Sequence, residues 1–567
     1  ATPLVYEPVR DARRRMIETT RRFTQDITQI QANATLAGTF GEVDWEVYYN
    51  KGYRTRTDVD FGQFFGPNLS NAMGPSADLN NDGQPECYQD VNDPSSIITG
   101  CVPFNFFGGG IVNAAGIPTM TTVTQDMIDY VGINLVDTFQ TDLDQGGLAF
   151  TGSMFELPGG AMGWAAGYEY RKEQFTYEPD SAKQKDEVTG NTGAGTSGQY
   201  SVDSLYVEFF APFFDNGSQA LNLTVGARYD DFSTFGENTT WQAGLEFSVF
   251  EDLKLRATAG EVFRAPGIGE LFGGQVDSFP TYNDPCDPSN NVGGVLAPGC
   301  AQATTQLDTQ VLARVGGNPF LDPEEGDTIT MGLVWTPTFG DHDISLTLDY
   351  WKTELEGLIT NLGVQYILND CYEDQNPNSC ALVTRRAVDY SIAQILDAPL
   401  NAALAEAEGI DTEIRWSFET GIGEFETAVL WAHYLTLDRQ AFPGDDPFDA
   451  VGRFTGAAFA QDKINYSVGW FRNDMSIRYL GEYISDLSST GVSFISTYDQ
   501  QIDAQLYHDL IFGYDIRSTG TRISAGITNV ADEAPPYIDL GFNASTDPST
   551  YRLFGRGYYV RVAQSFE

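Results

Sequence analysis

The chain alternates apolar and polar residues in segments of roughly ten residues, from about residue 25 to its end. The alternation is most regular in the segments 221–229, 241–249 and 344–350. Successive side chains of a β-strand point to opposite faces, so each segment has one apolar and one polar face. This period of two restricts the chain to an all-β fold and predicts one continuous set of β-strands.

Two features favour a transmembrane antiparallel β-barrel over a soluble β-sandwich, in which the apolar face would point inward. The polar positions carry full charges, which suit a water-filled lumen; they include Arg228, Glu246, Arg256, Asp349 and Glu413. Aromatic residues stand near the ends of many apolar faces, as in the interfacial girdles of membrane barrels. They include Tyr49, Trp164, Tyr170, Tyr229, Trp241, Trp335, Tyr350, Trp416, Trp431, Trp470 and Tyr479.

The length and the charge of the chain narrow the class further. At 567 residues the chain exceeds a single soluble core, yet no linker divides it, whereas a barrel grows with its strand number. No apolar run reaches about 18 residues, which excludes transmembrane helices. The net charge of −47 argues against nucleic acid as a partner. The acidic excess favours solubility in a salty or cation-rich medium; attraction of a cationic or metal-loaded ligand is the alternative.

The six cysteines fall in long loops as three close pairs: Cys87 with Cys101, Cys286 with Cys300, and Cys371 with Cys380. An even number with local pairing predicts three loop disulfides in an oxidising compartment. Metal or redox chemistry is the alternative, but the sequence has no CxxC motif and no cluster of Cys and His.

The alternating segments number eighteen, and the segment 452–461 alternates so poorly that we expect about seventeen strands. Eight short turns alternate along the chain with long connections, of which the longest are 58–139, 266–325 and 357–408. In outer-membrane barrels the short turns are periplasmic and the long loops are extracellular. We therefore expect these three connections outside the cell.

The first expected strand and the last both run towards the side of the short turns. Because consecutive antiparallel strands alternate in direction, the number of strands is odd. Bacterial single-chain barrels have an even number, with both ends in the periplasm. We therefore expect that the chain alone does not close a barrel. Residues 1–25 are expected to be the end of an extracellular loop, and residues 26–567 the barrel portion.

Several segments together are similar to one family, the TonB-dependent outer-membrane receptors in their large alphaproteobacterial form. The segments are 100–108, 157–171, 255–266, 317–324 and 527–532. The last strand, 557–566, resembles the aromatic-ended barrel assembly signal, but Glu567 follows the aromatic residue. The resemblance covers essentially the whole chain.

The resemblance implies a 22-stranded barrel, an N-terminal plug in its lumen and a segment that the energy-coupling protein grips. Counted back from the last strand, residues 26–38 form the sixth strand. We therefore expect the plug, the coupling segment and about five strands to be absent from this chain. A missing segment or a separate polypeptide would supply them.

The resemblance also implies the function: TonB-coupled uptake of a scarce small molecule, such as a siderophore or an oligosaccharide. The expected location is the outer membrane of a Gram-negative bacterium, with lipid and a TonB-type energy-coupling protein as partners. A passive porin or a structural outer-membrane barrel is the alternative. We expect no enzyme, because the three histidines are scattered and the sequence has no HExxH, GxSxG or P-loop motif.

One acidic segment, 78–86, begins like a calcium loop with the pattern D-x-N-x-D-G. Asp78, Asn80 and Asp82 would give side-chain oxygens and Gln84 a backbone carbonyl. Position twelve is Gln89 in place of the usual glutamate, so Glu86 and Asp90 are the candidate substitutes. The alternatives are a structural Ca²⁺ and an acidic surface turn.

Overall fold

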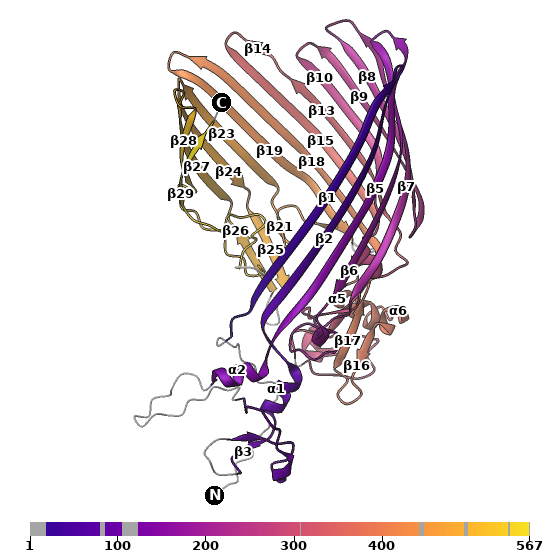
Figure 1. Ribbon diagram of the computed structural model, residues 1–567, viewed down its shortest axis with the longest axis vertical. Helices are drawn as coiled ribbons and strands as arrows, with labels where there is room; N and C mark the ends of the chain where they lie inside the picture. Colours follow the sequence, from indigo (N-terminus) through magenta and orange to yellow (C-terminus); the bar gives the residue numbers. More distant parts are fainter. Residues whose placement is uncertain are drawn as a thin grey trace.

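A single large sheet of nineteen strands dominates the computed structural model (Figure 1). The structure describes residues 19–79, 85–104, 123–306, 308–440, 447–492, 497–541 and 545–565. Two of the nineteen strands, β14 (Thr338–Phe339) and β20 (Phe448–Asp449), have only two residues each. Seventeen strands therefore build the wall, the number that the sequence predicts.

Each wall strand pairs antiparallel with the next wall strand along the chain. In order the wall strands are β1 (Arg22–Phe40), β2 (Val43–Phe64), β5 (Gly132–Leu157), β6 (Gly160–Glu178), β7 (Thr196–Asp215), β8 (Ala220–Phe232), β9 (Gly236–Phe250), β10 (Leu253–Arg264), β13 (Glu324–Trp335), β15 (His342–Asn361), β18 (Pro399–Thr420), β19 (Gly423–Gln440), β23 (Asp462–Arg472), β24 (Met475–Ile484), β27 (Gln505–Ile516), β28 (Thr521–Thr528) and β29 (Gly557–Gln564).

The short turns lie at one end of the wall and the long connections at the other (Figure 1). The tight turn between β1 and β2 requires Gly41 at φ +65°, and the turn between β23 and β24 holds Asn473 at φ +53°. Glycine and asparagine tolerate this left-handed backbone best, so both residues help to fix the hairpins. None of the helices in the described ranges is long and apolar enough to span a membrane.

The strands extend beyond their expected ends. β2 continues to Phe64 and β5 begins at Gly132, so the first long connection shrinks from 58–139 to 65–131. The other two shrink to 265–323 and 362–398. The segment 452–461 does not join the wall: it forms the two-residue strands β21 (Arg453–Phe454) and β22 (Ala458–Phe459) of a separate sheet.

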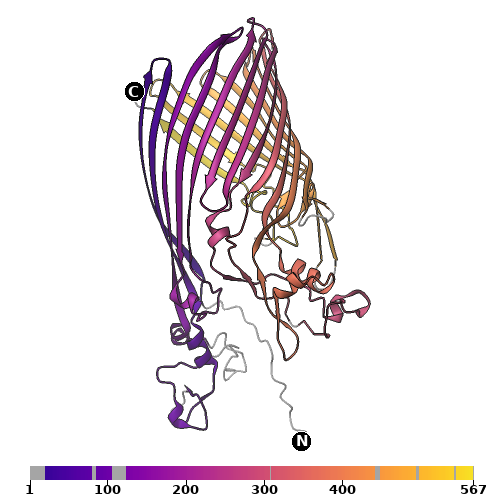
Figure 2. The same cartoon turned by 90° about the vertical axis from the view of Figure 1, so that its right-hand side faces the viewer.

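The wall is curved but open within the described residues (Figure 2). β1 pairs only with β2, and β29 pairs only with β28. β1 is the first and β29 the seventeenth strand of the wall. Because neighbouring strands are antiparallel, these two edge strands run in the same direction. Antiparallel closure would need an odd number of further strands between them.

The register collects the apolar and the polar positions on opposite faces. Leu348 of β15 stands opposite Leu333, and its neighbour Asp349 stands opposite Gly332. The polar face is the concave one, since its side chains reach across an intervening strand: Tyr48 Oη of β2 donates to Glu169 of β6 at 2.7 Å. The prediction of a charged interior is thereby confirmed.

Aromatic residues border the apolar face at both ends of its strands. Towards the short turns these residues include tryptophans, and the indole N–H of Trp470 donates to a turn carbonyl at 2.9 Å. Towards the long connections they are mainly tyrosines, and the hydroxyl of Tyr49 donates to Asp144 at 2.6 Å. Such rings place an apolar body beside a polar tip, the arrangement of an interfacial girdle.

The two faces predict opposite effects of a charge. Leu348→Arg puts a guanidinium on the convex apolar face and should lower the free energy of unfolding in lipid by about 2–4 kcal/mol. Thr347→Arg, one residue away on the concave face, should have little effect. Urea titration of the barrel refolded in lipid vesicles measures both; equal losses would contradict the assignment of the faces.

Candidate functional site

Three modules built from the long connections stand at the end of the wall opposite the short turns (Figures 1 and 2). Module A is the described part of residues 65–131. It contains α1 (Gly66–Met73), the hairpin of β3 (Ser76–Ala77) and β4 (Glu86–Cys87), the 3-10 turn η1 (Pro94–Ser96) and α2 (Gln125–Val131). Ala72, Phe104 and Val131 form its small core.

Module B combines residues 265–323 and 362–398. Its sheet has the order β11 (Val276–Ser278), β12 (Ala313–Val315), β17 (Ile392–Asp397), β16 (Val383–Arg385), and its helices are α4 (Ile268–Phe272), α5 (Val364–Tyr372) and α6 (Pro377–Ala381). The 3-10 turns η2 (Pro288–Asn290) and η3 (Val292–Gly294) complete it. β12 and β17 pair parallel, so the two connections share one fold.

The three predicted disulfides are confirmed, and all lie in modules A and B. The Cα atoms of Cys87 and Cys101 are 5.9 Å apart, and those of the other two pairs are 5.6 and 4.7 Å apart. Cys286 and Cys371 are fully buried in the apolar core of module B. The disulfides reinforce small cores that have few apolar residues of their own.

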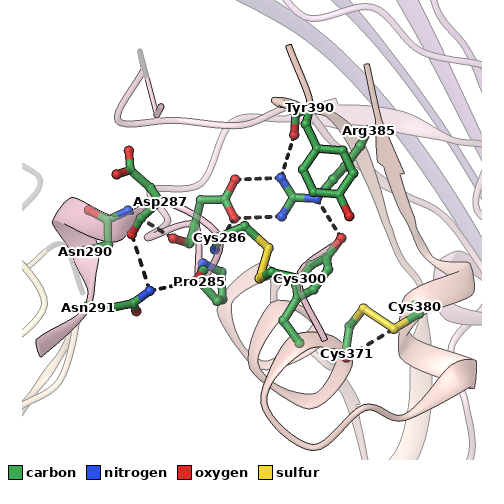
Figure 3. Close-up of a disulfide and its surroundings, with 12 residues drawn as sticks. Pro285, Cys286, Asp287, Asn290, Asn291, Cys300, Cys371, Cys380, Arg385 and Tyr390 are labelled. Carbon is green, nitrogen blue, oxygen red and sulfur yellow. Dashed lines mark hydrogen bonds and ion pairs between the residues drawn. A yellow bond between two sulfur atoms is a disulfide. The ribbon is translucent and has the colours of Figure 1, made fainter. Parts of the chain in front are cut away.

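A buried ion pair stands beside these disulfides (Figure 3). Arg385 holds Asp284 with two hydrogen bonds of 2.7 and 2.8 Å, and its Nε donates to Tyr372 Oη at 2.7 Å. The guanidinium also lies over the rings of Tyr372 and Tyr390, 4.6 and 4.7 Å from their centroids. The side chains of Arg385 and Asp284 are only 6% and 1% exposed, so each ion depends on the other.

Burial also shifts two titrating groups of module B. It raises the pKa of Tyr282 to about 12. It raises the pKa of Asp397 as well, although the backbone N–H of Gly363 donates to that carboxyl group at 3.2 Å. Tyr282 is therefore neutral at physiological pH and acts as a buried packing residue of the core.

Breaking the ion pair on one side should destabilise module B. Arg385→Met leaves Asp284 buried without its counter-ion and should lower the local free energy of opening by about 3–5 kcal/mol. Hydrogen exchange of peptides from α5 measures the loss. The double variant Arg385→Met with Asp284→Leu should recover most of it, because no charge remains buried; unchanged exchange in the single variant would contradict this account.

Module C combines the described parts of the connections 441–461, 485–504 and 529–556. Its sheet has the order β22, β21, β25 (Leu487–Val492), β26 (Thr497–Ile502), and its core includes Phe454, Tyr507 and Ile538. Arg552 reaches the concave face of the wall, where it pairs with Glu482 and Asp509 at 2.8 Å each. Module C is thus folded inward over β24 and β27.

The concave face carries a hollow of about 700 Å³ near the short turns, at the end of the wall opposite the modules. Small residues of β18, β19 and β23 make its floor, and Arg415, Arg478, Asp343 and Glu426 bring both signs of charge to it. Arg478 also lies over the ring of Phe471, 5.1 Å from the centroid. The hollow is therefore polar and open to the lumen.

The candidate calcium residues are only partly described. Asn80, Asp82 and Gln84 lie outside the described residues, whereas Asp78 directly follows β3 and Glu86 is the first residue of β4. Glu86 accepts a hydrogen bond from Tyr88 Oη at 2.7 Å. The described ranges hold no group of three or more Cys, His, Asp or Glu side chains suited to a metal ion.

Sequence reasoning missed the residues that organise the modules. Arg385, Asp284 and Arg552 stand in connections without a period, and the residues with which they form ion pairs are 43 to 101 residues away. No local pattern identifies such pairs. A charged residue beside a cysteine pair, such as Asp284 near Cys286, is the nearest signal in the sequence.

One family model and several solved structures are similar to this chain. The sequence model described as TonB dependent receptor-like, beta-barrel, matches residues 5–530. The siderophore receptor PirA from Acinetobacter baumannii is 12% identical, with a TM-score of 0.49 over 96% of this chain and 81% of that one. A mutant of the ferric enterobactin receptor PfeA from Pseudomonas aeruginosa, with enterobactin bound, is 12% identical, with a TM-score of 0.49 over 95% of this chain and 81% of that one. The FrpB iron transporter from Neisseria meningitidis is 11% identical, with a TM-score of 0.44 over 96% of this chain and 80% of that one.

A curved antiparallel wall with a charged concave face, short turns at one end and cored modules at the other is the wall of a transmembrane β-barrel. The family match extends over most of the chain, so the chain belongs to the TonB-dependent receptors, an outer-membrane family. This family consists of receptors and transporters rather than enzymes.

Proposed function

We propose that this chain is the wall and mouth of an outer-membrane receptor that takes up a scarce small molecule with energy from a TonB-type coupling protein. The observation that carries the proposal is the set of three cored modules at the mouth of a charged lumen. The ligand class is a siderophore or an oligosaccharide, bound first by the modules. Outer-membrane lipid of a Gram-negative bacterium surrounds the apolar face.

The alternative functions are a passive porin and a structural barrel. A porin needs an open aqueous path through its lumen. Module C is instead held against the concave wall by the two ion pairs of Arg552, so a folded module occupies this side of the mouth. This argument favours gated uptake over passive diffusion.

Energy dependence separates the two classes. Uptake of the copurifying ligand by cells that produce the receptor should stop when a protonophore collapses the proton-motive force, and binding to the cell surface should remain. Native mass spectrometry of the purified receptor identifies that ligand. Uptake that continues at an unchanged rate after the protonophore would contradict the proposal and favour a porin.

We also propose that five further strands close the wall to the 22 strands of the family, around a plug. The open edges support this, because β1 and β29 run in the same direction and accept only an odd number of strands. Intact-mass measurement and N-terminal sequencing of the native receptor test it. A single species that begins at Ala1 and still forms a closed barrel would contradict the proposal.

Calcium binding by the segment 78–86 is a separate proposal, supported by its D-x-N-x-D-G sequence beside Cys87. Millimolar Ca²⁺ should raise the unfolding temperature of module A in the parent protein. The variant Asp78→Ala with Asp82→Ala should lose this increase, because two ligands are gone. The absence of any calcium effect in the parent would contradict the proposal.

A further inference from the structure

The connection between β6 and β7, residues 179–195, lies between modules A and B and touches both. We call it the strap; it contains the short helix α3 (Ser181–Gln184). Its residues belong to neither module, and no disulfide reaches it. Its contacts with the two modules are nevertheless largely backbone hydrogen bonds, which give it a fixed position.

The first half of the strap is bound to the base of module A. The N–H of Gly66, at the start of α1, donates to the carbonyl of Glu187 at 2.7 Å. Lys183 pairs with Asp137 of β5 at 2.7 Å, and these side chains are only 16% and 12% exposed. An ion pair so well shielded from water is screened less than a surface pair.

The second half of the strap is bound to β11 of module B. The N–H of Ala194 donates to the carbonyl of Gln275 at 2.9 Å, and the N–H of Asp277 donates to the carbonyl of Thr192 at 3.2 Å. The hydroxyl of Thr192 donates to the carboxylate of Asp277 at 2.5 Å. The strap thus continues the sheet of module B by a short ladder.

Two further contacts connect the strap and β11 to the rest of module B. Arg314 of β12 pairs with Asp277 at 3.3 Å, and β12 pairs in turn with β17 in the core. Gly274 lies so close to the strap that a Cβ there would collide with the carbonyls of Ala194 and Gly195. Only glycine fits this close approach of two backbones.

Module C is arranged differently. Within the described ranges its sheet pairs with no strand of module A, of module B or of the strap. Its own connections and the ion pairs of Arg552 hold it to β24 and β27.

We infer that the strap couples modules A and B into one rigid body at the mouth, and that module C moves independently of it. A displacement of module B therefore reaches α1 and the ends of β2 and β5 through the strap. If the proposed receptor function holds, binding of the ligand to module B alone shifts module A as well.

Hydrogen exchange of the full chain in lipid nanodiscs, without ligand, tests the coupling apart from transport. Gly274→Val wedges the strap away from β11, and Asp277→Ala removes the side-chain contacts of the junction. Gly269→Ala is the matched control, because an added Cβ at that position of α4 meets no atom within 4 Å. In the first two variants, peptides covering 187–196 and 66–73 should exchange at least about fivefold faster.

Module C and the control variant should exchange as in the parent protein. Faster exchange of the strap with unchanged exchange of α1 would overturn the coupling. Unchanged exchange of the strap would show that β11 does not hold it, and would overturn the inference too. Faster exchange of module C to the same extent would contradict its independence.

Discussion

The structure depends on one constraint, the continuous antiparallel ladder of hydrogen bonds from β1 to β29. Backbone groups inside a bilayer find no water, so the sheet has to satisfy them itself. The same ladder sets which face each side chain takes, since a slip of one residue exchanges the faces. Most register shifts occur towards the strand ends, as between Asp60 and Gln63, whereas the shift between Glu408 and Gly409 lies within β18.

The modules solve a different physical problem. They stand beyond the apolar band, in water, and cannot use the ladder to stay folded. Each has a small apolar core, and modules A and B add disulfides. The Arg385–Asp284 pair and the inward contacts of Arg552 fix positions that such small cores leave loose. The wall and the modules therefore depend on different interactions for their stability.

The sequence predicts the wall well because the period of two acts locally. Segments such as 344–350 show it within seven residues, and the eight turns follow from short polar interruptions. Strand ends are less predictable: β5 begins at Gly132 because its outer part pairs with β2, where Val136 stands opposite Val59. The family adds the functional class, which the period alone does not contain.

The module contacts are not predictable in this way. Asp284 and Arg385 meet only after two connections have joined through β12 and β17. Thr192 of the strap meets Asp277 only where the strap reaches β11. The predicted disulfides are the exception, because close spacing in sequence already brings Cys286 near Cys300.

The central claim is that the apolar face of this ladder contacts lipid while the charged face lines a wet lumen. Fluorophores attached to single cysteines introduced along 344–350, in the receptor reconstituted in vesicles, test it most directly. We predict quenching by a lipid-phase quencher at Ile344, Leu346 and Leu348, and quenching by a water-soluble one at Ser345 and Thr347. Equal quenching at neighbouring positions, or the reverse pattern, would contradict the account.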